Sequence, residues 1–186
     1  MSTHYHPIAK GLHWLMAVAI LGMMALGLVM HEMPLSPEKL QYYSWHKWTG
    51  VSLFLLTWLR LLWRLRCPAP PLPEHMPRNH QRLAHAGHAA LYALMLAIPL
   101  SGWLMSSAKG VQTVWLGVVP LPDLLARDRA LGDLLQTVHA ALSWVLVVMV
   151  AAHVLAALYH HRVLRDDTLY RMWPRRMQAH TNSASS

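Results

Sequence analysis

Long apolar runs without a charged residue dominate the pattern of this chain. Three of them cover residues 11–30, 83–108 and 134–161, and none contains Asp, Glu, Lys or Arg. Each run is long enough to cross a bilayer, because a hydrocarbon layer of about 30 Å needs about 20 residues of α-helix. The run 11–30 is long for a signal peptide and has no small-x-small cleavage site, so we expect it to remain as a span.

A fourth apolar segment is interrupted by charge. Residues 48–59 are apolar, but the chain continues with Arg60 and Arg64. This segment crosses the membrane only if Arg60 snorkels or is paired inside the bundle, and we accept it as a span. The predicted fold is therefore all-α, an integral membrane four-helix bundle in one domain. The domain covers residues 1–176, with spans at about 11–31, 46–65, 86–108 and 136–160, and a disordered tail at 177–186.

The segments between and after the spans also have interpretable patterns. Residues 66–82 contain five prolines and predict a stiff extended loop rather than a helix. The loop 109–133 is long enough to form a lid over the outer mouth of the bundle. Residues 166–174 mix aromatic and basic side chains, which is typical of a segment at the membrane interface.

The distribution of Lys and Arg predicts the orientation. If the N-terminus is cytoplasmic, Lys10 and the segments 60–82 and 162–176 place 11 of the 16 Lys and Arg residues inside. The other face receives five. The positive-inside rule therefore predicts a multi-pass membrane protein with both termini in the cytoplasm.

Composition supports a membrane location and excludes several other classes. The chain is 55% hydrophobic and only 13% charged, whereas soluble domains average about 25% charged residues. A single cysteine, Cys67, excludes an internal disulfide, and the chain has no CxxC or CxxCH motif for a thiolate metal site or a covalent c-type haem. The net charge of +8 occurs without a nucleic-acid-binding motif, so nucleic acid is not an expected partner.

Histidines within the spans are the main candidates for chemistry. His139 and His153 lie 14 residues apart, which separates them by about 21 Å along a helix and leaves them within roughly 40° of one face. One helix thus offers two ligands at two depths. His13 opens the first span level with His153, and His46 opens the second span level with His139. We predict two haems b with bis-histidine iron ligation, which suits electron transfer rather than oxygen binding.

Other histidines leave alternatives open on each face. A lone interfacial histidine usually contacts a headgroup or ends a helix, but four histidines at two matched depths argue against that interpretation. On the cytoplasmic side His85 and His88 could replace His13. On the outer side His31 could replace His46, although its neighbour Glu32 suggests ordinary solvation.

Two further residues share faces with these histidines. Arg60 follows His46 by 14 residues, so it lies at the cytoplasmic depth, where it could contact a haem propionate or simply snorkel. His160 follows His153 by seven residues, about 10.5 Å nearer the cytoplasm. It could serve a propionate or a substrate whose reduction takes up protons.

Four groups of residues carry a resemblance to a known family. They are His13-Trp14, the segment WHKWTG at 45–50, RLAHAGH at 82–88 with Tyr92, and the run 160–174 that ends in TLYRMWP. Over residues 5 to about 176 the chain resembles the bacterial cytochrome b561 family, in particular its superoxide-oxidising members.

The resemblance implies an enzyme, a superoxide:ubiquinone oxidoreductase. Superoxide would be oxidised to oxygen at the periplasmic face of the bacterial inner membrane, and electrons would pass through two haems b to reduce ubiquinone to ubiquinol. The family's haem ligands fall on the same four histidines. Its quinone site carries over to His160 first, with His85 and Arg82 as further candidates near the same face.

Charge and alternative functions qualify this expectation. The outer loops contain five basic and five acidic residues, so steering of an anion requires a local cluster. Lys47, Lys109, Arg127 and Arg129 could form one. The main rival function is a cytochrome b subunit that passes electrons between quinol and a partner dehydrogenase or hydrogenase. A transporter or structural membrane protein would bind no haem.

Overall fold

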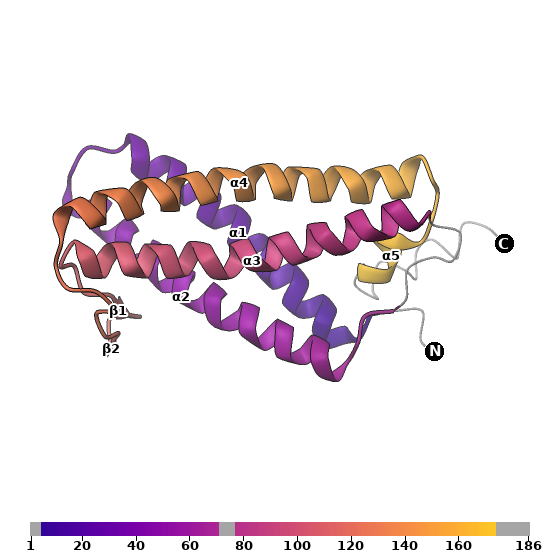
Figure 1. The fold of residues 1–186 in the computed structure, drawn as a ribbon, viewed down its shortest axis with the longest axis horizontal. Helices are drawn as coiled ribbons and strands as arrows, with labels where there is room; N and C mark the ends of the chain where they lie inside the picture. The colour runs from indigo at the N-terminus through magenta and orange to yellow at the C-terminus, as the bar shows by residue number, and fades with distance from the viewer. Residues whose placement is uncertain (1–4, 71–76, 174–186) are drawn as a thin grey trace.

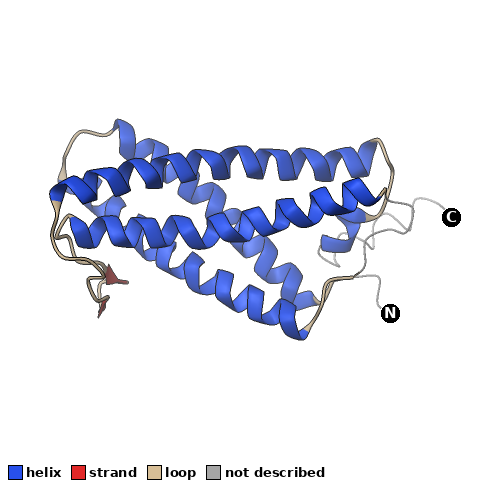
Figure 2. Ribbon diagram, viewed as in Figure 1, coloured by secondary structure: helices blue, strands red, loops and turns tan. Residues whose placement is uncertain are grey.

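The computed structural model describes residues 5–70 and 77–173 and is mostly helical (Figures 1 and 2). Its helices pack in chain order, α1 against α2, α2 against α3 and α3 against α4. A two-stranded antiparallel hairpin joins α3 to α4, and a short helix follows α4. The elements are α1 (Pro7–Glu32), α2 (Pro37–Arg66), α3 (Arg78–Ala108), β1 (Val114–Trp115), β2 (Val119–Pro120), α4 (Arg129–Arg162) and α5 (Thr168–Met172).

The long helices extend beyond the predicted spans because their polar ends carry good helix-start signals. Pro7 and Pro37 occupy first-turn positions, where a missing N–H costs nothing. The Ser36 hydroxyl accepts from the Lys39 N–H at 3.2 Å, and Asp128 accepts from the Leu131 N–H at 3.1 Å. Each cap satisfies a backbone donor that the helix leaves open.

One predicted loop is partly helical. Residues 66–82 were expected to be extended throughout, yet α3 begins at Arg78, directly after Pro77. The prediction was wrong for 78–82 because the polar residues there favour a helix once the prolines end. Residues 71–76 of this loop lie outside the described residues. The tail 177–186, which the sequence predicts to be disordered, lies outside them as well.

The surface of the bundle is apolar where a soluble protein would be polar. Val18, Val148 and Leu155 are 69%, 66% and 65% exposed, respectively. Among the described residues, three helices are long and apolar enough to cross a membrane: α1, α3 and α4. The chain is therefore a membrane protein whose exposed apolar side chains suit lipid contact.

The two ends of the bundle are built differently. At one end, the Trp14 indole N–H donates to the Met172 carbonyl at 2.9 Å, and the Lys10 ammonium donates to the Trp173 carbonyl at 3.1 Å. These bonds fold α5 back against the start of α1. We call this the α5 end; it also holds the end of α2, since the His6 and Trp63 rings are in contact there.

The opposite end carries the hairpin, and we call it the hairpin end. The Trp48 indole N–H donates to the Val114 carbonyl at 2.7 Å, and the Trp115 N–H donates to the Ser52 hydroxyl at 3.2 Å. The connection between α3 and α4 thus packs beside α2. Both helices flanking this connection are visible at the same end in Figure 1, with the hairpin below them.

Candidate functional site: two histidine pairs along one helix

The first pair lies at the hairpin end. The rings of His46 on α2 and His139 on α4 have centroids 6.2 Å apart. A metal bound between two imidazole nitrogens at about 2 Å each, with roughly 1.2 Å from nitrogen to ring centre, separates the centroids by about 6.4 Å. The spacing is therefore compatible with both rings holding one metal ion between them.

Neighbours on α3 orient the His139 ring. Its Nδ1 lies 3.0 Å from the Ile98 carbonyl oxygen and 3.1 Å from the Ser101 hydroxyl. Because a carbonyl only accepts, Nδ1 carries the proton and Nε2 keeps its lone pair. An imidazole oriented by a second-nitrogen hydrogen bond is the usual arrangement of a metal-bound histidine. His46 differs, since its Nδ1 is buried and has no hydrogen-bond partner among the described residues.

Gly102 makes room for the His139 ring. A Cβ at this position would lie 3.2 Å from Cε1 and 3.3 Å from Nδ1 of His139, closer than most real Cβ contacts. The absent side chain lets the ring lie directly against the α3 backbone. Sequence reasoning missed Gly102 and Ser101 because their role depends on how α3 and α4 pack.

The second pair lies toward the α5 end. His13 on α1 and His153 on α4 have ring centroids 6.2 Å apart, the same spacing as the first pair. His153 follows His139 by 14 residues, so the two pairs are about 21 Å apart along α4. His88 on α3 also contacts His153, with centroids 5.6 Å apart. The structure thus keeps His88 open as an alternative to His13.

Arg60 lies beside this second pair, at the depth expected from its 14-residue spacing to His46. Its Nη2 is 3.3 Å from His13 Nδ1, and its Nε donates to the Tyr92 hydroxyl at 2.9 Å. The Arg64 guanidinium lies 5.9 Å from the Tyr92 ring centre. Since arginine only donates, His13 Nδ1 accepts here and Nε2 bears the proton. Metal ligation by His13 therefore requires Arg60 to release this nitrogen.

Other predicted candidates lie elsewhere. His31 is 84% exposed and forms an ion pair with Glu32 at 3.0 Å, so the structure does not bring it to His139. Arg82 and His85 are exposed on the first turns of α3, near the α5 end.

His160 forms a pair that the sequence did not reveal. Its Nδ1 lies 2.5 Å from Oδ2 of Asp166, whose side chain is only 7% exposed. Burial alone would raise the pKa of Asp166, but hydrogen bonds from His160 and from Thr168 outweigh it and lower that pKa. The pair crosses the end of α4, where helical periodicity no longer relates residues, so spacing could not have indicated it.

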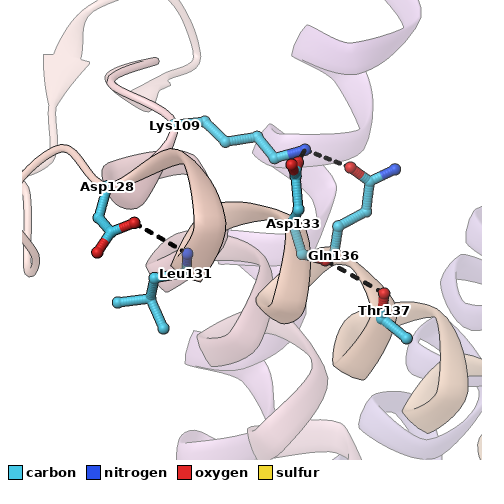
Figure 3. A network of polar contacts seen from close by, with 6 residues as sticks. All are labelled: Lys109, Asp128, Leu131, Asp133, Gln136 and Thr137. Atoms are coloured by element: carbon cyan, nitrogen blue, oxygen red, sulfur yellow. Dashed lines mark hydrogen bonds and ion pairs between the residues drawn. The ribbon is translucent and has the colours of Figure 1, made fainter.

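Several basic residues at the hairpin end are ion-paired, hydrogen-bonded or packed against neighbouring residues. Figure 3 shows Lys109 reaching from the end of α3 to Asp133 and Gln136 on α4. The Lys109 ammonium lies 3.2 Å from the Asp133 carboxylate, so its charge is locally balanced. Lys47 donates to the Val111 carbonyl at 3.3 Å, and the Arg127 side chain lies against Gly110.

Comparison with known proteins decides the family. The model of the family described as prokaryotic cytochrome b561 matches residues 4–175. The chain is 39% identical over 177 residues to cytochrome b561 homolog 2 of Escherichia coli (strain K12), covering 90% of each protein. The chain belongs to the prokaryotic cytochrome b561 family.

Two further relatives agree with this assignment. The protein named probable superoxide oxidase CybB of Yersinia pestis is 31% identical over 180 residues, covering 95% of this chain and 99% of that protein. Cytochrome b561 homolog 1 of Escherichia coli (strain K12) is 30% identical over 131 residues, covering 70% of this chain and 74% of that protein. The resemblance stated from the sequence is confirmed.

Membership of the cytochrome b561 family gives the chain a general role. Proteins of this family are membrane oxidoreductases that bind haem b and take part in electron transport. The two histidine pairs are suitable donor sets for that cofactor, because neutral imidazole is a standard axial ligand of haem iron. The spacing of each pair, and the room that Gly102 leaves for the His139 ring, fit this cofactor. At the second pair, Arg60 would have to give up its contact with His13 before haem could bind there.

Proposed function

We propose that this cytochrome b561 holds two haems b and oxidises superoxide while it reduces ubiquinone. The observation that supports this most is the equal 6.2 Å spacing of His46/His139 and His13/His153 at two levels of α4. One site near each end of the bundle would connect the two membrane faces. The similarity to a protein named probable superoxide oxidase supports the choice of substrates.

Four histidines and one arginine would hold the cofactors. His46 and His139 would ligate the haem at the hairpin end, and His13 and His153 the haem toward the α5 end. Haem b in such sites accepts and releases one electron at a time, which matches the one-electron oxidation of superoxide. Arg60 is placed to donate to a propionate in exchange for its contact with His13.

We propose that α2 is the fourth span. Its charged residue within the apolar stretch, Arg60, lies at the depth of the second histidine pair and points to His13 and Tyr92, not to lipid. The opposite face is apolar and exposed, as lipid contact requires. Its exposed members recur at helical spacing: Leu55, Trp58, Leu59 and Leu62.

We assign the hairpin end to the periplasm and the α5 end to the cytoplasm of the bacterial inner membrane. The support is the excess of Lys and Arg in the segments at the α5 end, 11 against five. Superoxide would then meet the hairpin end. With Lys109 balanced by Asp133, the other three members of the predicted basic cluster would attract the anion: Lys47, Arg127 and Arg129.

The α5 end is the proposed quinone site. His160 is the central residue, and Arg82 and His85 lie on the first turns of α3 at the same end. Two superoxide anions, one ubiquinone and two protons would give two oxygen molecules and one ubiquinol. Quinone reduction thus needs a proton donor, and a histidine is suited to that role.

The deciding experiment is a superoxide assay on the purified chain. Superoxide should disappear faster with a ubiquinone analogue present than without it, and ubiquinol should form in half the amount of superoxide consumed. Free haem b with the same quinone is the control. A haem-loaded protein that consumes no superoxide above this control would refute the proposal.

That failure would favour a second function. The other relatives are named only as cytochrome b561 homologs, and an electron-transfer subunit would use the same histidine pairs. Such a protein would exchange electrons with quinol and a partner dehydrogenase or hydrogenase. Its haems would be reduced by quinol or by the partner, and superoxide would leave them unchanged.

A further inference from the structure

The turn between α4 and α5 holds a sheltered carboxylate–histidine pair. His160 Nδ1 lies 2.5 Å from Asp166 Oδ2, within hydrogen-bond distance. The two side chains are only 17% and 7% exposed. The other histidine ion pair, His31 with Glu32, has both side chains 84% exposed. Only the first pair is shielded enough from water to act as a fixed unit.

Asp166 is held in place by the turn itself. Its Oδ1 accepts from the Thr168 N–H at 2.9 Å, and its own N–H donates to the His160 carbonyl at 3.1 Å. Arg165 has a φ of 51°, so the chain reverses there through the left-handed region. A carboxylate restrained at both its backbone and its side chain restrains in turn the ring that it binds.

We propose that Asp166 is a positioning residue for proton delivery by His160. It fixes Nδ1 and thereby presents Nε2 as the nitrogen that hands a proton to a quinone oxygen. In each transfer the Nε2–H bond breaks, a quinone O–H bond forms, and water at the α5 end restores the proton. Two transfers accompany the two electrons supplied by two superoxide anions. This inference rests on the proposed quinone site.

Other titratable groups surround the pair without replacing Asp166. On α4, the Tyr159 ring lies edge-on to His160 at 6.3 Å. On α5, the Tyr170 ring contacts His161 instead, at 5.1 Å. The first turns of α3 bring His80, Arg82 and His85 to this end. Among the described residues, Asp166 is the carboxylate bonded to His160.

Asp167 supplies a matched control. It carries the same charge one residue further along the chain, but it is exposed and makes no side-chain capping bond to α5. Replacing either aspartate with asparagine therefore removes one negative charge from the same turn. Only Asp166→Asn removes the carboxylate that is bonded to His160.

The test measures how fast a ubiquinone analogue reoxidises the superoxide-reduced haems, in stopped flow across a range of pH. We expect Asp166→Asn to slow reoxidation about tenfold to a hundredfold, as losses of orienting partners do. The pH profile of the rate should also differ from that of the wild type, because asparagine places no charge beside His160. Haem spectra and superoxide-driven reduction should stay normal, and Asp167→Asn should match the wild type.

A second variant separates positioning from charge. Asp166→Glu keeps the charge but displaces the carboxylate by one methylene, so we expect a slower reaction whose pH profile stays near that of the wild type. An unchanged rate in Asp166→Glu would overturn the positioning role even if Asp166→Asn could not be purified.

The outcomes distinguish this inference from the proposed function. If quinone reoxidises the wild type and Asp166→Asn behaves as Asp167→Asn does, the role of Asp166 is refuted and the proposed function stands. A uniform slowing of Asp166→Asn without movement of the pH profile would also refute it, since a purely structural bond predicts that. If quinone does not reoxidise the wild type at all, both the proposed function and this inference fail.

Discussion

At the scale of single residues, the two proposed haem sites depend on which histidine rings contact each other. His139 is oriented by Ile98 and Ser101, and its ring rests on Gly102. His153 instead contacts two histidines, His13 at 6.2 Å and His88 at 5.6 Å. The first site is therefore closely defined, while the second needs mutation to separate its two candidate partners.

His13→Ala should remove one of two haems, whereas His88→Ala should leave both. The reason is that the His13 and His153 rings repeat the spacing of the other pair, which one bridging iron requires. Pyridine haemochrome analysis per mole of purified protein measures the result. The opposite pattern, one haem in His88→Ala and two in His13→Ala, would make His88 the ligand.

Gly102→Ala should weaken haem retention at the hairpin end. The added methyl would lie 3.2 to 3.3 Å from atoms of the His139 ring. The hydrogen bonds of that ring oppose its moving away. We expect the haem content to fall toward one per chain. Gly87→Ala on the same helix is the control, because nothing lies within 4 Å of its Cβ. It should keep both haems and add roughly 0.5–1 kcal/mol of helix stability. Equal haem content in the two variants would remove Gly102 from the site.

At the scale of elements, the turn from α4 to α5 should be sensitive to acid. The pKa of Asp166 is lowered from its usual value of 3.8, so its ionised form stabilises the folded turn. This contribution is complete above that value and is lost as the pH falls through the lower pKa of the folded state.

Thermal unfolding of the wild type and Asp166→Asn checks this prediction. The wild type should be the more stable at neutral pH, by on the order of 1–3 kcal/mol, as for hydrogen bonds to charged groups. The difference should shrink below about pH 4. A difference that is independent of pH would show that Asp166 ionisation does not stabilise the turn.

Much of the element pattern could be predicted from the sequence, for an identifiable reason. Runs without charge must form helices in a membrane, so α1, α3 and α4 were located from hydropathy alone. Helix ends outside the apolar layer are set by caps and prolines, and for that reason the start of α3 at Arg78 was misjudged. Neither α5 nor the hairpin leaves a periodic signal, because five-residue helices and two-residue strands depend on contacts with α1 and α2.

The candidate site, too, could be predicted from the sequence only in part. Register along one helix related His139 to His153, and the alternation of spans related them to His46 and His13; the structure brings these rings together as expected. Ser101, Gly102 and Asp166 act through contacts between segments that no sequence spacing relates. The four histidines could therefore be selected from the sequence, whereas the residues that support them are identified only in the packed bundle.

At the scale of the whole molecule, the basic residues predict a fixed orientation. A reporter that works only in the cytoplasm should be active when fused after Arg176 and inactive when inserted near Asp128, in the connection to α4. A periplasmic reporter at the same two positions should give the complementary result. The reverse pattern would place the hairpin end, and the proposed superoxide side, in the cytoplasm.

The proposed function requires that one chain hold two haems b between two pairs of histidines. Its most direct test is the molar ratio of haem b to protein in the purified wild type, by pyridine haemochrome and amino-acid analysis. The two pairs, about 21 Å apart along α4, predict two haems per chain. A ratio of one, or the absence of haem, would contradict the account.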